Sequence, residues 1–250
     1  MTPSHAIRLL QDPPLNGSTN MARDESLLVR VGERRSAPTL RLYRWDPPTI
    51  SLGYFQRYAD YAALPPPLDT LAVVRRQTGG GAILHDLELT YSLTLPLDHE
   101  LLGRGPNRVY ELVHDAVRGC CRDLGIESSR CGFTDDSGPH RGPFFCFARR
   151  HRYDLVVGDD KVAGSAQRRT RSALLQHGSI IAADRFDQPG AATLPLPLDD
   201  ALAALRQRLP AHLARLSGAR IEPAEWSDEE LEESSRLFHK YAGEEWTRRT

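Results

Sequence analysis

The sequence lacks a long apolar run, and it lacks an excess of charge of either sign. No stretch approaches the roughly 20 apolar residues that cross a bilayer, and the first residues lack the apolar core of a secretory signal. We therefore expect a cytoplasmic protein without membrane contact. The 32 Lys and Arg residues are balanced by 33 Asp and Glu residues, which argues against general nucleic-acid binding. The basic runs 149–152 and 168–171 could attract an acidic partner, and they are equally typical of a solvated surface.

Cysteine is scarce and unpaired in its spacing. The four cysteines form no C-x-x-C pair and have no histidines at ligand spacing, so we expect no metal site. In a reducing compartment they should be thiols. Cys120 falls on the apolar stripe of an expected helix, together with Val109, Leu112, Val113, Ala116 and Val117, and this pattern predicts core packing.

The chain also lacks a Ser/Gly-rich linker, an internal repeat and a low-complexity tract. Its 250 residues therefore predict one domain, 1–250, of the α/β (α+β) class, with a mixed β-sheet flanked by helices. The patterns predict strands at 7–10, 40–45, 49–52, 71–74, 82–85, 89–95, 153–157, 162–167 and 174–181. They predict helices at 20–31 with Asn20 as N-cap, at 107–124, at 198–216 with a break or kink at Pro210, and at 227–238. The Gly-, Pro- and Asp-rich segment 131–143 predicts a mobile loop that closes over the site.

A glycine-rich turn is the most informative local feature. Gly79, Gly80 and Gly81 follow Arg75 and Arg76 and precede a segment rich in β-forming residues. Glycines allow positive φ and let several backbone N–H groups approach a phosphate or carboxylate. The run is neither a dinucleotide fingerprint nor a P-loop, because no helical pattern follows it and no Gly-Lys-Ser/Thr ends it. The turn therefore indicates an anionic ligand of another kind.

Three motifs together carry a family resemblance. They are RR-x-T-GGG-A-x-L-HD at 75–86, K-V-A-G-S-A-Q-x-R at 161–169 and L-Q-H-G-S-I at 175–180. In this order the chain resembles the superfamily of lipoate-protein ligases and octanoyltransferases, which also includes biotin ligases. Supporting segments at 20–25, 45–56 and 240–246 extend the resemblance over nearly the whole chain. It implies a catalytic domain like that of the biotin/lipoyl protein ligases.

Cys146 decides between the two activities that the resemblance implies. Cys146-Phe147, Tyr153-Asp154-Leu155 and Lys161 resemble the Cys-Phe, Tyr-Glu-Leu and Lys of octanoyl-acyl-carrier-protein:protein octanoyltransferases. Such an enzyme passes an octanoyl group through its own thiol and needs no cofactor. The alternative is an ATP-dependent lipoate-protein ligase, which forms lipoyl-AMP and needs ATP and Mg. Gly81, where the transferases often have arginine, and the run Arg149-Arg150-His151 depart from the transferase pattern.

The resemblance also implies roles for individual residues. Cys146 is the expected nucleophile, and Lys161 is expected to stabilise the thiolate and the developing oxyanion. Either Lys161 or His85 could accept the proton of the incoming amine. The expected substrate-binding residues are Arg75, Gly79, Gly80, Gly81, His85, Ala163, Gly164 and Ser165. From spacing alone, Cys146 would more often be a buried apolar residue, and Lys161 could be only a lysine at the exit of a hairpin.

The implied partners follow from the same resemblance. The expected donor is octanoyl-acyl carrier protein. The expected acceptors are lipoyl domains, namely the glycine-cleavage H protein and the acyltransferase subunits of 2-oxo-acid dehydrogenases. Biotin ligation is disfavoured because the Gly-Arg-Gly-Arg type of loop is absent. A non-catalytic module that binds acylated carrier is the alternative from another functional class, and it would form no covalent adduct.

Overall fold

The computed structural model describes residues 6–103, 105–134 and 142–249. Its large sheet has the order β11-β1-β2-β6-β10-β9-β8-β7, and a small sheet has the order β4-β3-β5. The strands are β1 (Ala6–Leu15), β2 (Thr39–Trp45), β3 (Thr49–Leu52), β4 (Ala72–Arg75), β5 (Ile83–His85), β6 (Glu88–Pro96), β7 (Ser129–Arg130), β8 (Leu155–Val157), β9 (Asp160–Arg169), β10 (Ala173–Ile181) and β11 (Arg220–Pro223). The large sheet mixes parallel and antiparallel pairs, so the predicted mixed sheet is confirmed.

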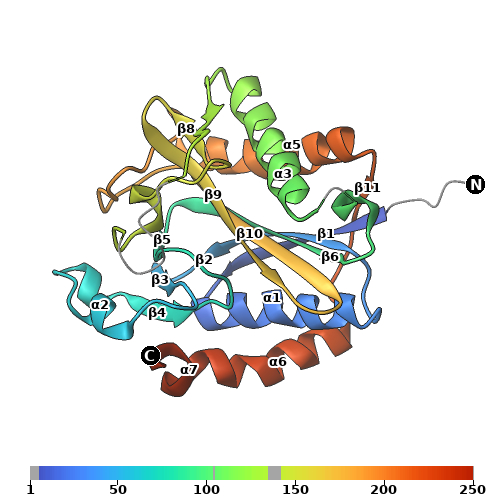
Figure 1. The fold of residues 1–250 in the computed structure, drawn as a ribbon, viewed down its shortest axis with the longest axis horizontal. Helices are drawn as coiled ribbons and strands as arrows, with labels where there is room; N and C mark the ends of the chain where they lie inside the picture. Colours follow the sequence, from blue (N-terminus) through green and yellow to red (C-terminus); the bar gives the residue numbers. More distant parts are fainter. Residues whose placement is uncertain (1–5, 104, 135–141, 250) are drawn as a thin grey trace, which may run out of the picture.

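Helices cover both faces of the large sheet (Figure 1). The chief ones are α1 (Gly17–Gly32), α3 (Asn107–Asp123), α5 (Leu198–Ser217) and α6 (Asp228–Ala242), with short α2 (Tyr58–Ala62) and α7 (Glu244–Arg248). α3 and α5 pack over one face, and α1 and α6 lie along the other (Figure 1). The predicted α/β class with flanking helices is therefore confirmed. No described helix is long and apolar enough to span a membrane.

The central strands β6 and β10 are buried along their whole length. One face of β6 places Leu89, Tyr91, Leu93 and Leu95 in the main core with α3 and α5, and Cys120 lies in the same core as predicted. Residues 90, 92 and 94 alternate with these apolar positions and turn hydroxyls toward α1, because successive strand residues point to opposite faces. The second face therefore holds buried polar groups.

Three sequence predictions need correction or restriction. Asn16, and not Asn20, caps α1, because the Asn16 side chain accepts a hydrogen bond from the Thr19 amide at 2.9 Å. Asn20 is buried within the helix and donates to two backbone carbonyls. α5 continues through Pro210, so no break occurs there. The predicted mobile loop at 131–143 falls largely on 135–141, which lie outside the described residues.

Candidate functional site

A pocket of about 340 Å³ brings together the glycine-rich turn, Cys146 and β9. It is lined by Gly79, Gly80, Gly81, Tyr110, Cys146, Arg149, Arg150, His151, Asp154, Lys161, Ser165, Ala166 and Gln167. The small sheet places the turn at one wall, because β4 and β5 both pair with β3 and the turn connects them. Segments that are far apart in the sequence thus meet at one opening, as the motif resemblance predicts.

Cys146 begins a short 3-10 turn, η3 (Cys146–Ala148), at the edge of the pocket. Its amide donates to Ala82 O at 2.7 Å, and the Ala82 amide donates to Phe144 O at 2.9 Å. These two bonds tie the cysteine to the residue that follows the glycine-rich turn. The Cys146 side chain is partly exposed, whereas Cys120 and Cys121 are buried. The geometry therefore offers the Cys146 sulfur to the pocket.

Lys161 lies against the cysteine. Its Nζ is 3.5 Å from Cys146 Sγ, 3.3 Å from Cys146 O and 2.8 Å from Asp154 Oδ2. Burial lowers the pKa of the Lys161 ammonium, but Cys146 and Asp154 outweigh burial, so the pKa lies above its ordinary value. Lys161 is therefore a protonated hydrogen-bond donor at neutral pH. Asp154 also accepts from the His151 amide at 2.8 Å, which holds its carboxylate in place.

Three of the predicted glycines are favoured by their surroundings: Gly81 and Gly164 by close contacts, and Gly80 by its backbone conformation. A Cβ at Gly81 would lie 3.0 Å from Cys146 N and 3.0 Å from Phe144 O. Gly80 has φ +94°, a conformation that L side chains rarely adopt. A Cβ at Gly164 would lie 2.2 Å from Lys161 Cε, so Gly164 makes room for the lysine without lining the pocket itself. Any side chain at position 164 would displace Lys161.

Ser165 lines the pocket and ends a buried polar chain. The carbonyl of Tyr153 can only accept, so His114 carries its proton on Nδ1 and donates there. His114 Nε2 then accepts from Ser165 Oγ at 2.6 Å, and Ser165 also contacts the Tyr91 hydroxyl. Burial lowers the pKa of His114 to about 4. Ser165 is therefore held by a neutral imidazole, and one lone pair of its hydroxyl remains for a ligand.

Besides Gly164, three predicted binding residues do not line this pocket. Arg75 donates to the carbonyls of Gly53, Gln56 and Thr247, and so joins α7 to the body of the protein. Ala163 is buried in the main core. His85 is buried against Trp45, with ring centroids 3.8 Å apart. Burial lowers its pKa, although Glu88 opposes that effect.

His85 instead lines a smaller cavity of about 20 Å³ behind the glycine-rich turn. The cavity shares Ala166 with the main pocket and is also lined by Met21, Ile83 and Arg76. The sequence patterns left Arg76 open between binding the donor and pairing with local carboxylates, and they assigned no role to Asp154, Tyr110 or His114. Asp154 stands inside a quoted motif and was recognisable there, whereas Tyr110 and His114 lie on a helix whose pattern indicates only packing.

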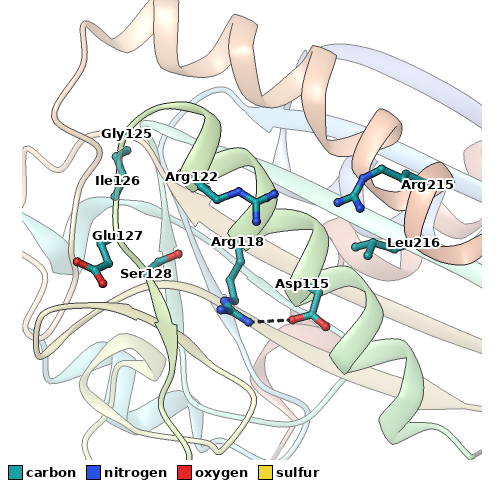
Figure 2. Close-up of a pocket in the computed structure, with 10 residues that line it drawn as sticks. Asp115, Arg118, Arg122, Gly125, Ile126, Glu127, Ser128, Arg215 and Leu216 are labelled. Carbon is teal, nitrogen blue, oxygen red and sulfur yellow. Dashed lines mark hydrogen bonds and ion pairs between the residues drawn. The ribbon is translucent and has the colours of Figure 1, made fainter.

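A larger cleft of about 740 Å³ lies elsewhere, between α3 and α5 (Figure 2). Arg122 and Arg215 point toward each other across it, and Arg118 pairs with Asp115 at 3.3 Å. None of the predicted site residues lines this cleft, and no cysteine or lysine lies among its lining residues. The pocket at Cys146 is therefore the candidate active site, although it is the smaller of the two.

Comparison with known proteins places the chain in a family. The family model described as "Lipoyl protein ligase A/B catalytic domain" matches residues 16–188. Octanoyltransferase LipM of Kyrpidia tusciae is 33% identical over 97% of this chain and 98% of the relative, and octanoyltransferase LipM of Moorella thermoacetica is 36% identical over 94% and 88%.

Solved structures share the fold. A lipoate-protein ligase A bound with ATP has a TM-score of 0.75 and 23% identity, with 97% of this chain and 98% of that chain covered. A bi-partite lipoate protein ligase from Thermoplasma acidophilum has a TM-score of 0.69 and 20% identity, with 98% and 96% covered. These identities show the fold alone, whereas the family model and the full-length relatives show descent. The chain therefore belongs to the lipoyl protein ligase A/B catalytic domain family.

Proposed function

We propose that Cys146 carries an octanoyl group from acyl carrier protein to the lysine of a lipoyl domain. The chain is an acyltransferase of lipoate biosynthesis, since relatives aligned over nearly its whole length are octanoyltransferases. One observation supports the cysteine route above all others: Cys146 Sγ lies 3.5 Å from the buried Lys161 ammonium, at the opening of the pocket. A nucleophile beside a fixed cation is the arrangement that thiolate chemistry requires.

In the first step the Cys146 thiolate attacks the carbonyl carbon of the donor thioester. The new Sγ–C bond forms, the carrier C–S bond breaks, and the carrier leaves as a thiol after taking up a proton equivalent to the one that the Cys146 thiol released. The Lys161 ammonium would donate to the oxyanion of the intermediate, and backbone amides of the glycine-rich turn would add further donors. One thioester replaces another, so the step is nearly isoenergetic and requires no nucleotide.

In the second step the neutral amine of the acceptor lysine attacks the Cys146 thioester. The amide C–N bond forms, the Sγ–C bond breaks, and the proton lost by the amine returns to the sulfur. Lys161 serves as a donor in both steps, because its pKa is raised. We do not assign His85 as the base, because it lies outside the lining of the pocket and is held by Ser51 and Glu88.

The identity of residue 161 also supports the proposal. Of the 32 basic residues, only Lys161 and Lys240 are lysines. A compact ammonium with three donors fits beside a thiol in a buried site, whereas an arginine fork suits flat, bidentate partners. A lysine at position 161, in a chain whose other basic residues apart from Lys240 are arginines, is consistent with a specific role.

The octanoyl chain would extend from Cys146 past Ala166 toward the small cavity beside Ile83. The donor is octanoyl-acyl carrier protein and the acceptors are lipoyl domains, in the glycine-cleavage H protein or the 2-oxo-acid dehydrogenase acyltransferase subunits. We expect no cofactor and a cytoplasmic location, because the mechanism needs a reduced thiol. The structural relative from Thermoplasma acidophilum is described together with its E2 lipoyl domain.

An ATP-dependent ligase is the second candidate. It is favoured by one observation, the fold shared with a ligase that binds ATP. In that case ATP and Mg would be required, free lipoate or octanoate would be the substrate, and Cys146 would be dispensable. The two candidates therefore differ in their need for ATP and in the presence of a covalent enzyme adduct.

Intact-mass analysis separates these candidates. The protein is mixed with octanoyl-acyl carrier protein without ATP, and a lipoyl domain is added afterwards. We expect an octanoyl adduct that is absent in Cys146→Ala and that passes to the lipoyl domain. Cys131→Ala is the matched control, because Cys131 is partly exposed but does not line the pocket. Full transfer by Cys146→Ala, or modification only with a free acid and ATP, would refute the transferase.

A further inference from the structure

Arg76 is a fully buried arginine whose partners are all neutral. Its side chain donates to Ser51 O at 2.8 Å, Ser51 Oγ at 3.2 Å, Thr78 Oγ1 at 3.1 Å, Gly79 O at 2.8 Å and Gly81 O at 2.7 Å. The residue is 2% exposed. In the described part of the chain no carboxylate lies within ion-pair distance of it. A buried charge is costly unless it is paired, so an unpaired cation here requires a reason.

The nearest carboxylates are held at a distance by two parallel relays. Ser51 accepts from Arg76, so its own proton goes to His85 Nε2 at 2.7 Å, and His85 Nδ1 donates to Glu88 at 2.6 Å. Each relay places one hydroxyl and one imidazole between the arginine and an acid. The positive charge is thereby stabilised without a counter-ion beside it.

The second relay has the same form. Thr78 Oγ1 accepts from Arg76 and gives its proton to His177 Nε2 at 2.7 Å, and His177 Nδ1 faces Asp24 Oδ2 at 3.1 Å. Asp24 is itself committed to Arg41 at 2.8 Å. Neither acid can therefore reach the guanidinium of Arg76.

Arg76 and Cys146 both adjoin the glycine-rich turn. It draws the carbonyls of Gly79 and Gly81 toward itself, and in a planar trans peptide the N–H of Gly80 then points away from the arginine. Gly81 in turn lies so close to Cys146 N that a Cβ there would be 3.0 Å away. The arginine thus orients the turn and adds positive charge beside it.

Lys161 is the other buried cation at the sulfur, at 3.5 Å from Cys146 Sγ. Asp154 lies 2.8 Å from the Lys161 ammonium and offsets part of its charge, whereas no acid among the described residues offsets the charge of Arg76 in this way. The remaining charged or titratable groups that line the pocket are Tyr110, Arg149, Arg150 and His151. The two arginines lie at the partly exposed rim, where salt screens them. Burial lowers the pKa of Arg76 to about 10 although Cys146 opposes that effect, so Arg76 is charged at neutral pH.

We propose that Arg76 is the positioning residue of the thiol site: it fixes the glycine-rich turn by its carbonyls and supplies the uncompensated positive charge that favours the Cys146 thiolate and the oxyanion. The inference rests on the proposed role of Cys146 as nucleophile. The two hydroxyl–imidazole relays explain how the fold keeps this charge buried without neutralising it. Arg75, its neighbour in the sequence, has no such role.

The pH dependence of Cys146 alkylation tests the proposal. Iodoacetamide is reacted with the protein across a pH series, and modification of the Cys146 peptide is followed by mass spectrometry. Arg76→Gln should raise the midpoint pH by about one unit or more, because a nearby positive charge is lost. Arg76→Lys should keep the midpoint near that of the unaltered protein but slow octanoyl transfer, since an ammonium cannot span both glycine carbonyls.

Arg75→Gln is the matched control, because Arg75 is equally buried and bonded to carbonyls but does not line either cavity. An unchanged midpoint in Arg76→Gln, or an equal shift in Arg75→Gln, would overturn the proposal. Should Arg76→Gln fail to fold, the double variant Lys161→Met/Asp154→Asn decides at about 0.5 M salt, because it removes the other buried cation with its acid and the salt screens the rim arginines. A midpoint still below the ordinary thiol value of about 8.5 supports Arg76, and a midpoint at or above that value overturns the proposal. Adduct formation by the unaltered protein tests the proposed function separately.

Discussion

Arg41 and Arg76 are both buried, yet their surroundings are opposite. Arg41 pairs with Asp12 at 2.7 Å and Asp24 at 2.8 Å, whereas Arg76 meets only hydroxyls and carbonyls. Burial lowers the pKa of both, but the two acids outweigh burial at Arg41 and raise its pKa, while the pKa of Arg76 falls to about 10. The charge of Arg41 is neutralised by its acids and stabilises the fold. The charge of Arg76 is not neutralised, so it can still attract an anionic ligand or a thiolate.

The largest effect should come from removing Arg41 from its buried cluster with Asp12 and Asp24. Arg41→Met leaves the buried Asp24 without its arginine and leaves Asp12 with Arg23 alone, so the free energy of unfolding should fall by about 3–5 kcal/mol. Urea unfolding measures this loss. Arg236→Ala, which removes an exposed pair with Glu232, should change stability by less than about 1 kcal/mol. Equal losses in both variants would show that the buried cluster is not a stabilising unit.

The second prediction concerns Lys161 and the rate of octanoyl transfer. Lys161→Met should slow octanoyl transfer about 10²–10³-fold, because the oxyanion loses a preorganised donor. Single-turnover transfer from octanoyl-acyl carrier protein measures the rate. Lys240→Met is the control, since Lys240 is the other lysine of the chain and pairs with Glu25 far along the sequence from the pocket residues. An unchanged rate in Lys161→Met would remove Lys161 from the mechanism.

A smaller effect should follow from shifting the same ammonium without deleting it. Gly164→Ala places a Cβ 2.2 Å from Lys161 Cε, so the lysine must leave its present position 3.5 Å from Cys146 Sγ. Misplacement of this kind should slow transfer by up to about 10²-fold. The thermal unfolding midpoint should be recorded in parallel. A variant that transfers at the full rate would show that the 3.5 Å contact between Lys161 and Cys146 is not needed.

Local patterns predicted the regular elements well where a single periodicity dominates. The helix at α3 was predicted at 107–124 and spans Asn107–Asp123, because one apolar stripe and a clear end define it. The N-terminus of α1 was misplaced by several residues, since Asn16 and Asn20 are both good capping residues. Only packing shows that Asn20 is buried against β1 and β2. Short β7, β11, α2 and α7 carry too few residues for a period to be visible.

The sequence by itself determined the family and the α/β class. It also identified Cys146, Lys161 and the glycine-rich turn as the candidate site, because motif order and residue chemistry can be read without coordinates. It selected Arg75 and not Arg76 as a binding residue, since adjacent strand residues alternate between faces and the pattern does not say which face meets the pocket. Tertiary structure alone decided that Arg75 joins α7 to the body and that Arg76 adjoins the turn. The two arginines differ because their roles depend on contacts between segments far apart in the sequence and on the burial that those contacts create.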